Sequence, residues 1–201
     1  MTEPIPAGTA PALSGSDLCT RCGLCCHGVL HEWGELEEEE VERVRAAGVG
    51  LERMRDRLVF SLPCSRVDGT VCTVYEHRPD ACRGYRCALL RRYEEGEIAL
   101  GDAVQLVGQA HALLDTVKSR LQPGESYRDF KTAWRDHMSG DKRIAFSGAE
   151  RSQRSGAFMA LAMLSRFIDR HFRLDRETLL VSPERNAELL REARAEKDAS
   201  A

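Results

Sequence analysis

The sequence predicts a mainly α-helical protein with a small, irregular, cysteine-rich metal-binding core and one short β-hairpin, an α+β fold in which helix dominates strand. Two observations predict this fold. All eight cysteines lie between residues 19 and 87, whereas the second half has none and shows helical periodicity of its apolar residues. A chain of 201 residues can also bury a core without disulfides as staples.

We expect three parts: a disordered leader (1–17), a cysteine-cluster domain (18–95) and a helical region (96–201) packed on it. The leader is rich in Pro, Ala, Gly and Ser, and it lacks the basic start and apolar core of a secretory signal. The longest apolar run, Ala157 to Leu164, is too short to cross a bilayer. The expected location is the cytoplasm, where a reducing thiol pool disfavours structural disulfides.

The first regular element is predicted between residues 34 and 48, where an acidic run precedes two arginines. The acidic residues stand in the first turns, and Arg43 and Arg45 stand near the end, which suits a helix dipole. Gly48 is the expected helix end. We interpret the run "ELEEEE" (35–40) as a solvated helix face rather than a binding surface.

A β-hairpin is predicted next. Leu58 to Phe60 begin one strand, Asp68-Gly69 is a turn signal, and Val71 to Tyr75 form the returning strand. This hairpin would bring Cys64 close to Cys72. Pro79 and Asp80 then favour a turn or the start of a helix.

The second half is predicted to form amphipathic helices. One is outlined by apolar residues from Leu106 to Leu121, and another by Phe158, Leu161, Ser165, Ile168 and Phe172. Residues 138–156 are expected to form a loop. Ser182 and Pro183 begin a charged helix at the carboxyl end of the sequence.

The cysteine pattern is the most informative motif. It opens with "CTRCGLCC", a C-x2-C-x2-C-C arrangement in which Gly23 permits a tight bend, and four more cysteines follow at wider separations. Eight thiols suffice for two four-ligand sites, either zinc held by four thiolates or iron–sulfur clusters. The expected metal ligands are Cys19, Cys22, Cys25, Cys26, Cys64, Cys72, Cys82 and Cys87.

The spacing favours iron over zinc, because three closely spaced cysteines with a remote fourth resemble ferredoxin-type ligation. Disulfides and free or catalytic thiols are the less favoured alternatives. Neighbouring side chains diverge in most backbone conformations, so either Cys25 and Cys26 face different sites or one is a free thiol. His27 and His77 are weaker ligand candidates, and nearby arginines would offset the negative charge of a thiolate site.

The segments "CTRCGLCC", "SLPC" and "CTVYEHRPDACRGYRC" resemble the YkgJ-type cysteine-cluster family, a zinc- or iron-chelating domain with a CxxCxxCC signature. The resemblance covers roughly residues 18–95 and implies that all eight cysteines chelate metal. It also implies that five neighbouring framework residues support the ligands: Tyr75, Arg78, Pro79, Arg83 and Tyr85. The cysteine pattern is similar to that of flagellin lysine N-methylases and of proteins labelled Fe–S oxidoreductases.

Three functions stay open from the sequence. The first is an iron–sulfur, zinc or iron protein with a redox or protein-modification role. The second is a structural zinc module whose helices bind a partner protein, and the third is a protein lysine methylase-like enzyme. No catalytic residue is assigned, since His111 and His137 read as core or surface histidines. The net charge of −3 and the short patch of Arg91, Arg92 and Tyr93 indicate no nucleic-acid partner, and no membrane partner is expected.

Overall fold

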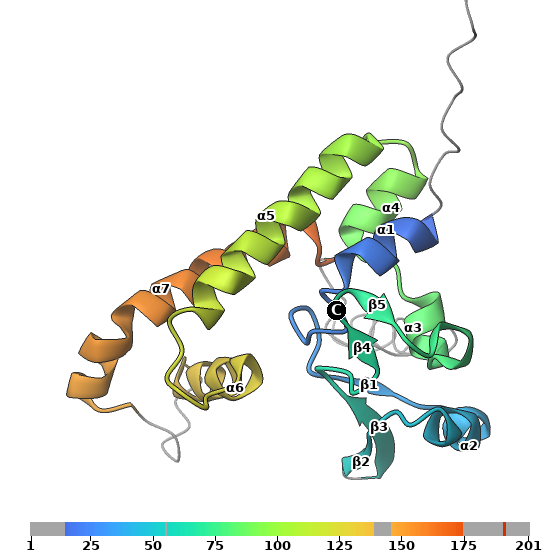
Figure 1. Cartoon of the computed structure of the whole chain (residues 1–201), viewed down its shortest axis with the longest axis horizontal. Coiled ribbons are helices and arrows are strands. Elements are labelled where there is room, and N and C mark those ends of the chain that lie inside the picture. Colours follow the sequence, from blue (N-terminus) through green and yellow to red (C-terminus); the bar gives the residue numbers. More distant parts are fainter. Residues whose placement is uncertain (1–14, 55, 139–145, 175–190, 192–201) are drawn as a thin grey trace, which may run out of the picture.

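The computed structural model describes residues 15–54, 56–138, 146–174 and 191. The protein is elongated, with a cysteine-rich region at one end and a helical region at the other (Figure 1). Helix dominates strand among the described residues, which confirms the predicted fold class. The first helix, α1, spans Gly15–Cys22, so it begins inside the segment predicted as a leader.

A three-stranded antiparallel sheet forms the far end of the cysteine-rich region. It consists of β1 (Trp33–Glu35), β2 (Leu51–Met54) and β3 (Arg57–Ser61), in the order β1-β3-β2. The predicted first hairpin strand is therefore β3, but it pairs with β1 and β2 instead of with the residues after Asp68. The strands of this sheet have only three to five residues each, which is too few for an alternation of apolar and polar residues to be recognised. This explains why β1 and β2 were not predicted.

The predicted turn at Asp68-Gly69 is confirmed in a much shorter hairpin. Strand β4 (Val67–Asp68) pairs with β5 (Val71–Cys72), with Val67 opposite Cys72. Gly69 adopts a φ of 55°, the left-handed conformation that a tight hairpin turn requires. Cys64 lies before β4, and its carbonyl accepts a hydrogen bond from the Val67 N–H at 3.3 Å.

The acidic segment is not a uniformly solvated helix face. A 3₁₀ turn (Glu38–Glu40) leads into α2 (Val41–Ala46), which ends before Gly48 as predicted. Glu40, however, is only 3% exposed and pairs with Arg43, and buried Glu35 pairs with Arg57. Two carboxylates of the run are thus buried and charge-compensated, which corrects the solvated interpretation.

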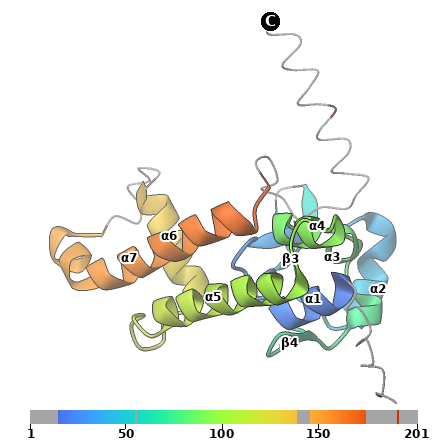
Figure 2. The same ribbon diagram turned by 90° about the horizontal axis from the view of Figure 1, so that it is seen from above.

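Short helices connect the two regions and long ones build the helical end. A 3₁₀ turn (Tyr75–His77) precedes α3 (Asp80–Gly84) and α4 (Ala88–Glu94). The long helices are α5 (Leu100–Lys118), α6 (Tyr127–Met138) and α7 (Gly148–His171). Helices α5 and α7 run side by side in opposite directions, and α6 crosses their outer end (Figures 1 and 2).

One prediction about the helical region was wrong, and one helix was missed. Residues 148–156, expected in a loop, form the first turns of α7, and helix α6 was not predicted. The start of α7 is set by Ser147, whose hydroxyl accepts from the Glu150 N–H while the Glu150 carboxylate accepts from the Ser147 N–H. This capping box satisfies two of the free N–H groups at the helix start. The predicted helix after Ser182 lies outside the described residues, Arg191 apart.

The buried apolar residues form two separate cores. The larger core joins α1, α4, α5, α6 and α7, and it includes an aromatic stack of Phe130 on Phe158 with ring centroids 5.5 Å apart. The smaller core lies between α2, β3 and α3, and contains Val44, Val49, Phe60, Leu62 and Ala81. Different cysteines pack against each core, and this separation organises the site.

Candidate metal centre

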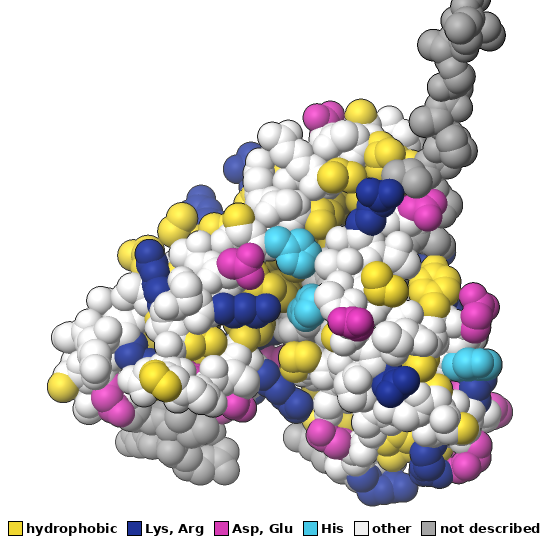
Figure 3. All heavy atoms as spheres, in the orientation of Figure 1, with side chains coloured by type: hydrophobic (Ala, Val, Ile, Leu, Met, Phe, Trp, Pro, Cys, Tyr) yellow, Lys and Arg dark blue, Asp and Glu magenta, His cyan; other side chains and the backbone are white. Residues whose placement is uncertain are grey.

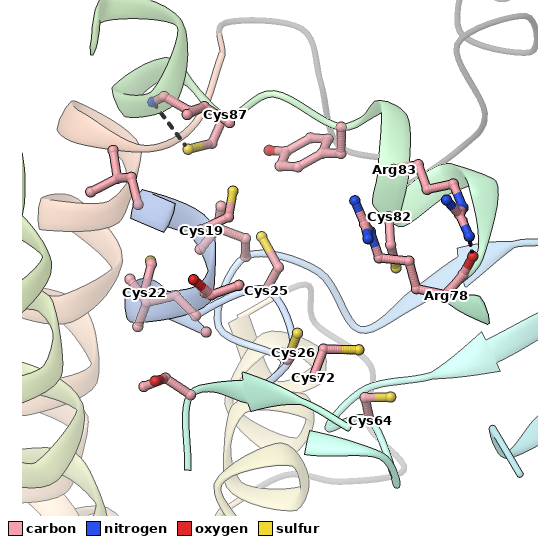
Figure 4. Close-up of a pocket in the computed structure, with 18 of the residues that line it drawn as sticks. Cys19, Cys22, Cys25, Cys26, Cys64, Cys72, Arg78, Cys82, Arg83 and Cys87 are labelled. Atoms are coloured by element: carbon pink, nitrogen blue, oxygen red, sulfur yellow. Dashed lines mark hydrogen bonds between the residues drawn. The ribbon is translucent and has the colours of Figure 1, made fainter. Parts of the chain in front are cut away.

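All eight cysteines line one cavity of about 230 Å³ at the junction of the two cores (Figure 4). None of them forms a disulfide. Cys19 is exposed, and the other seven are partly buried. The fold therefore gathers thiols that are up to 68 positions apart in the sequence, from Cys19 to Cys87.

The CxxCxxCC segment supplies four of these thiols from a helix and the turn after it. Cys19 and Cys22 stand on α1, and the chain then turns at Gly23, which has a φ of 61°. A Cβ at Gly23 would stand 3.0 Å from the Thr70 Cα in the β4–β5 turn. Glycine is therefore required twice over here, by the backbone conformation and by the approach of the hairpin.

The loop after the turn is held by backbone hydrogen bonds and by the helical region. Leu24 is fully buried, and its carbonyl accepts from the Val29 N–H at 3.0 Å. The Lys131 ammonium of α6 donates to the carbonyls of Gly28 (3.0 Å) and Val29 (3.3 Å). Burial lowers the pKa of Lys131 to about 8, and Glu32 opposes this shift. Cysteine-bearing backbone is thus fixed by a residue more than 100 positions away.

The four remote cysteines reach the cavity from four different segments of the chain. Cys72 ends β5, and Cys64 lies in the loop before β4. The Cys64 N–H donates to the Cys26 carbonyl at 2.8 Å, which joins this loop to the adjacent cysteine pair. Cys82 stands on α3, and Cys87 caps α4, its sulfur accepting from the Leu90 N–H at 3.4 Å.

The acidic segment has a structural role at this site that its sequence did not reveal. The Glu40 carboxylate accepts from the Asp80 N–H at 2.8 Å, and the Arg43 guanidinium contacts the Asp80 carboxylate at 2.9 Å. Arg43 also donates to the Arg78 carbonyl at 2.8 Å. These contacts fix the start of α3 and so determine where Cys82 stands.

Burial makes the thiols reluctant to ionise without a metal. Desolvation raises the pKa of Cys22 and Cys26 to about 12 and that of Cys87 to about 11. It raises the pKa of Cys25 and Cys82 well above the ordinary thiol value. These five thiols are therefore protonated at neutral pH in the metal-free protein, and a cation would have to displace those protons to bind thiolates.

Arg78 is one of three arginines that line the cavity, with Arg83 and Arg86 (Figure 4). Its guanidinium carbon lies 3.5 Å from the centroid of the Tyr75 ring, and its Nη1 donates to the Tyr75 carbonyl at 2.7 Å. Arg83 donates to the Arg78 carbonyl at 3.2 Å. Three of the five residues predicted to support the ligands, Tyr75, Arg78 and Arg83, are thus joined by direct contacts.

The histidines do not join the thiols. Neither His27 nor His77 lines the cavity, and the His27 ring N–H donates to the Gly69 carbonyl at 2.7 Å. His111 of α5, read from the sequence as a core or surface residue, instead donates to the Cys22 carbonyl at 2.7 Å. Nothing in the local sequence around His111 or Lys131 indicated these contacts, because they depend on how the helices dock.

The cavity is a donor set rather than a finished coordination sphere. Among the described residues, no three His, Cys, Asp or Glu side chains stand in a position to share one ion. Metal binding therefore requires the thiols to turn toward a common point. The donors themselves suit zinc or iron, since thiolate is a ligand that both accept and no carboxylate lines the cavity beyond Glu94.

A cavity lined by eight cysteines and by partly buried arginines defines a cysteine-ligated metal-chelating class of protein. The family comparison agrees with this: residues 18–102 match the family model CxxCxxCC, described as "Putative zinc- or iron-chelating domain". The match over this segment confirms the resemblance seen in the sequence. No curated protein and no solved structure matches the chain.

Two further observations bear on partners. In the described ranges, no helix has the length and apolar character needed to traverse a bilayer. On the face shown in Figure 3, basic and acidic side chains are interspersed rather than gathered into a basic patch. A basic patch is the electrostatic footprint of a nucleic-acid-binding surface.

Proposed function

We propose that this protein carries iron as an iron–sulfur cluster bound by its cysteines, and that the cluster serves electron transfer or redox sensing. One observation carries the proposal. Cys19, Cys22 and Cys25 come from a seven-residue segment, and Cys87 joins them from α4, which packs against α1. Three closely spaced ligands with a remote fourth are the arrangement that ferredoxin-type clusters use.

The surroundings support a redox role in two ways. The Leu90 N–H already donates to the Cys87 sulfur, and hydrogen bonds to cluster sulfurs raise the reduction potential. Cys19 is exposed at the edge of the cavity, so a bound cluster would lie close to the surface. When bound, the cluster would supply one-electron chemistry, while the protein supplies ligands, hydrogen bonds and a positive charge from Arg78.

The direct test is anaerobic purification of the full chain, followed by iron, zinc and acid-labile sulfide analysis and an absorption spectrum. We expect iron with sulfide in equal amounts and a brown, oxygen-sensitive protein. A colourless protein with zinc alone would contradict the cluster. That outcome would support the structural zinc module, in which the helical region is free to bind a partner.

Replacement of single ligands tests chelation itself, whichever metal is present. We expect Cys22→Ser and Cys82→Ser each to lose metal and to destabilise the cysteine-rich region. Ser65→Ala, which removes a hydroxyl that hydrogen-bonds to the backbone of Gly48 and Gly50, is a matched control that should keep its metal. Full metal content and stability in both cysteine variants would contradict chelation.

A further inference from the structure

We propose that the eight thiols form two separate metal centres, divided between the adjacent cysteines. The first centre comprises Cys19, Cys22, Cys25 and Cys87, and the second comprises Cys26, Cys64, Cys72 and Cys82. Each would take one tetrahedrally coordinated ion or one small cluster. The inference rests on the proposed metal-chelating function, and it assigns every ligand to a centre.

The first centre is built by the packing of α1 on α4. Cys19 and Cys22 are three positions apart on α1, so they share one face of that helix. The turn at Gly23 brings Cys25 back toward them, and Cys87 stands at the start of α4. In Figure 4 the sulfurs of these four residues lie on the same side of the cavity.

The second centre is built by the loops that enclose Cys26. The hydrogen bond from the Cys64 N–H to the Cys26 carbonyl places these two residues side by side. The β4–β5 pairing brings Cys72 next to the Cys64 loop, and α3 presents Cys82 from the opposite wall. In Figure 4 these four residues occupy the other side of the cavity.

The two hydrophobic cores make the same division independently. Cys22, Cys25 and Cys87 pack against the larger core, whereas Cys64 and Cys82 pack against the smaller one. Each group of ligands is therefore anchored to its own set of apolar residues. Tyr85 touches both cores, and it marks the boundary between the centres.

The division also accounts for the adjacent pair. The Cys25 carbonyl accepts from the Gly28 N–H at 2.9 Å within the CxxCxxCC turn, whereas the Cys26 carbonyl accepts from Cys64 across the cavity. Successive peptide groups thus belong to different substructures, and their side chains diverge accordingly. One ion bound by both thiols would require these neighbouring side chains to converge.

The experiment is reconstitution of the full chain with ¹¹³Cd²⁺ alone, a spin-active ion that stands in for zinc, followed by stoichiometry and ¹¹³Cd NMR. We expect two ions per chain and two resonances from four-thiolate sites. Correlation of cysteine β protons with each resonance should connect Cys25 to one cadmium and Cys26 to the other. Correlation of both residues to the same cadmium would overturn the proposal.

Double substitutions test the same proposal through the loss of bound cadmium. Cys22→Ser with Cys87→Ser should remove one ion and one resonance, and Cys64→Ser with Cys82→Ser should remove the other. The mixed pair, Cys22→Ser with Cys82→Ser, should remove both. If a variant with both substitutions in one centre lost both ions while α5 and α7 stayed helical, the proposal of two centres would be refuted. Binding of one ion per wild-type chain would refute it as well. If a variant does not fold, the wild-type proton correlations decide.

The outcomes separate this inference from the proposed function. A single cadmium per chain would refute the division yet leave chelation and the iron–sulfur test intact. Zinc in place of iron from anaerobic cells would refute the cluster yet leave two centres standing. A chain that binds neither cadmium, zinc nor iron would contradict both, and the single-cysteine variants would then match wild type.

Discussion

The cysteine-rich region and the helical region are stabilised in different ways. The helical region is joined by a large core in which rings stack and long helices pack along their length, with Phe130, Leu161, Leu164 and Ile168 almost fully buried. The cysteine-rich region has short strands and short helices, and its separate core has five buried members among the described residues. Burial of apolar area is the main source of stability. The second region therefore depends on its thiols and on docking to the first.

Removal of metal should have the largest effect, and it should act on one region only. Structural zinc binding contributes about 10–16 kcal/mol in zinc-finger peptides, which exceeds the stability of most domains. We expect a chelator to abolish amide hydrogen-exchange protection across β1–β5 and α3, while α5 and α7 stay protected. Unchanged protection in both regions would contradict the comparison, and re-addition of metal is the control for reversibility.

Acidification should release metal over a narrow range of pH. Because the folded-state pKa of Cys22 and Cys26 is about 12, these thiols are protonated at neutral pH and lose their protons on binding metal. A centre that releases about four protons loses affinity steeply as pH falls. We expect apparent affinity to rise from about pH 6 to about pH 8, with proton release measurable in weak buffer. A pH-independent affinity would show that the ligands are not thiols.

A cavity in the larger core should destabilise the helical region without removing metal. Phe130 is fully buried and stacks on Phe158, so Phe130→Ala should cost about 3–5 kcal/mol of unfolding free energy. Urea unfolding followed by α-helical circular dichroism measures the loss. Met163→Ala, at a side chain that is 56% exposed, should change stability by less than about 0.5 kcal/mol. Equal metal loss in both variants would show that the regions are not separable.

The two regions also differ in what their sequence discloses. The cysteine set and the turn at Asp68-Gly69 follow from local chemistry, so spacing alone predicted them. The long helices follow from apolar periodicity, and α5 and α7 were predicted to that extent. Helix α6 was missed although Tyr127, Phe130 and Trp134 stand at helical spacing among charged residues, and the start of α7 was missed because its capping box was not recognised.

The division of the thiols could not be read from spacing, because it depends on where the chain returns. Cys82 and Cys87 are five positions apart, yet they belong to different walls of the cavity, one set by α3 and the other by α4. Glu40 fixes α3 by accepting from Asp80, 40 positions later. Such contacts depend on tertiary packing. The sequence raises the question whether Cys25 and Cys26 bind at different metal sites, but it does not answer it.

The junction between the regions gives the next prediction. Lys131 donates to the carbonyls of Gly28 and Val29, so Lys131→Met should leave both without this partner. We expect a loss of about 1–3 kcal/mol and faster metal release to a competing chelator. Lys118→Met, at an exposed position on α5, is the matched control. Unchanged release kinetics would show that α6 does not hold the cysteine loop.

The smallest effect tests whether the two centres share a cation. Burial raises the pKa of both Cys19 and Cys82, and the Arg78 charge opposes the rise at each. The Arg86 charge likewise opposes the rise in the pKa of Cys19, and the Arg66 charge opposes the rise in the pKa of Cys64. Arg78 therefore interacts with a thiol of each centre, whereas the other two arginines serve one centre each.

We expect Arg78→Gln to weaken cadmium affinity at both centres by about tenfold, the lower end of what residues around metal ligands contribute. Arg86→Gln should weaken cadmium affinity at the first centre only, and Arg66→Gln at the second centre only. Competition with a chelator, followed separately at each ¹¹³Cd resonance, measures the affinity of each centre. Arg78→Lys keeps the charge but loses the guanidinium stack on Tyr75, so it should recover part of the affinity. If Arg78→Gln weakened one centre alone, the two centres would differ in charge compensation as well as in ligands. Arg78 would then belong to a single wall of the cavity.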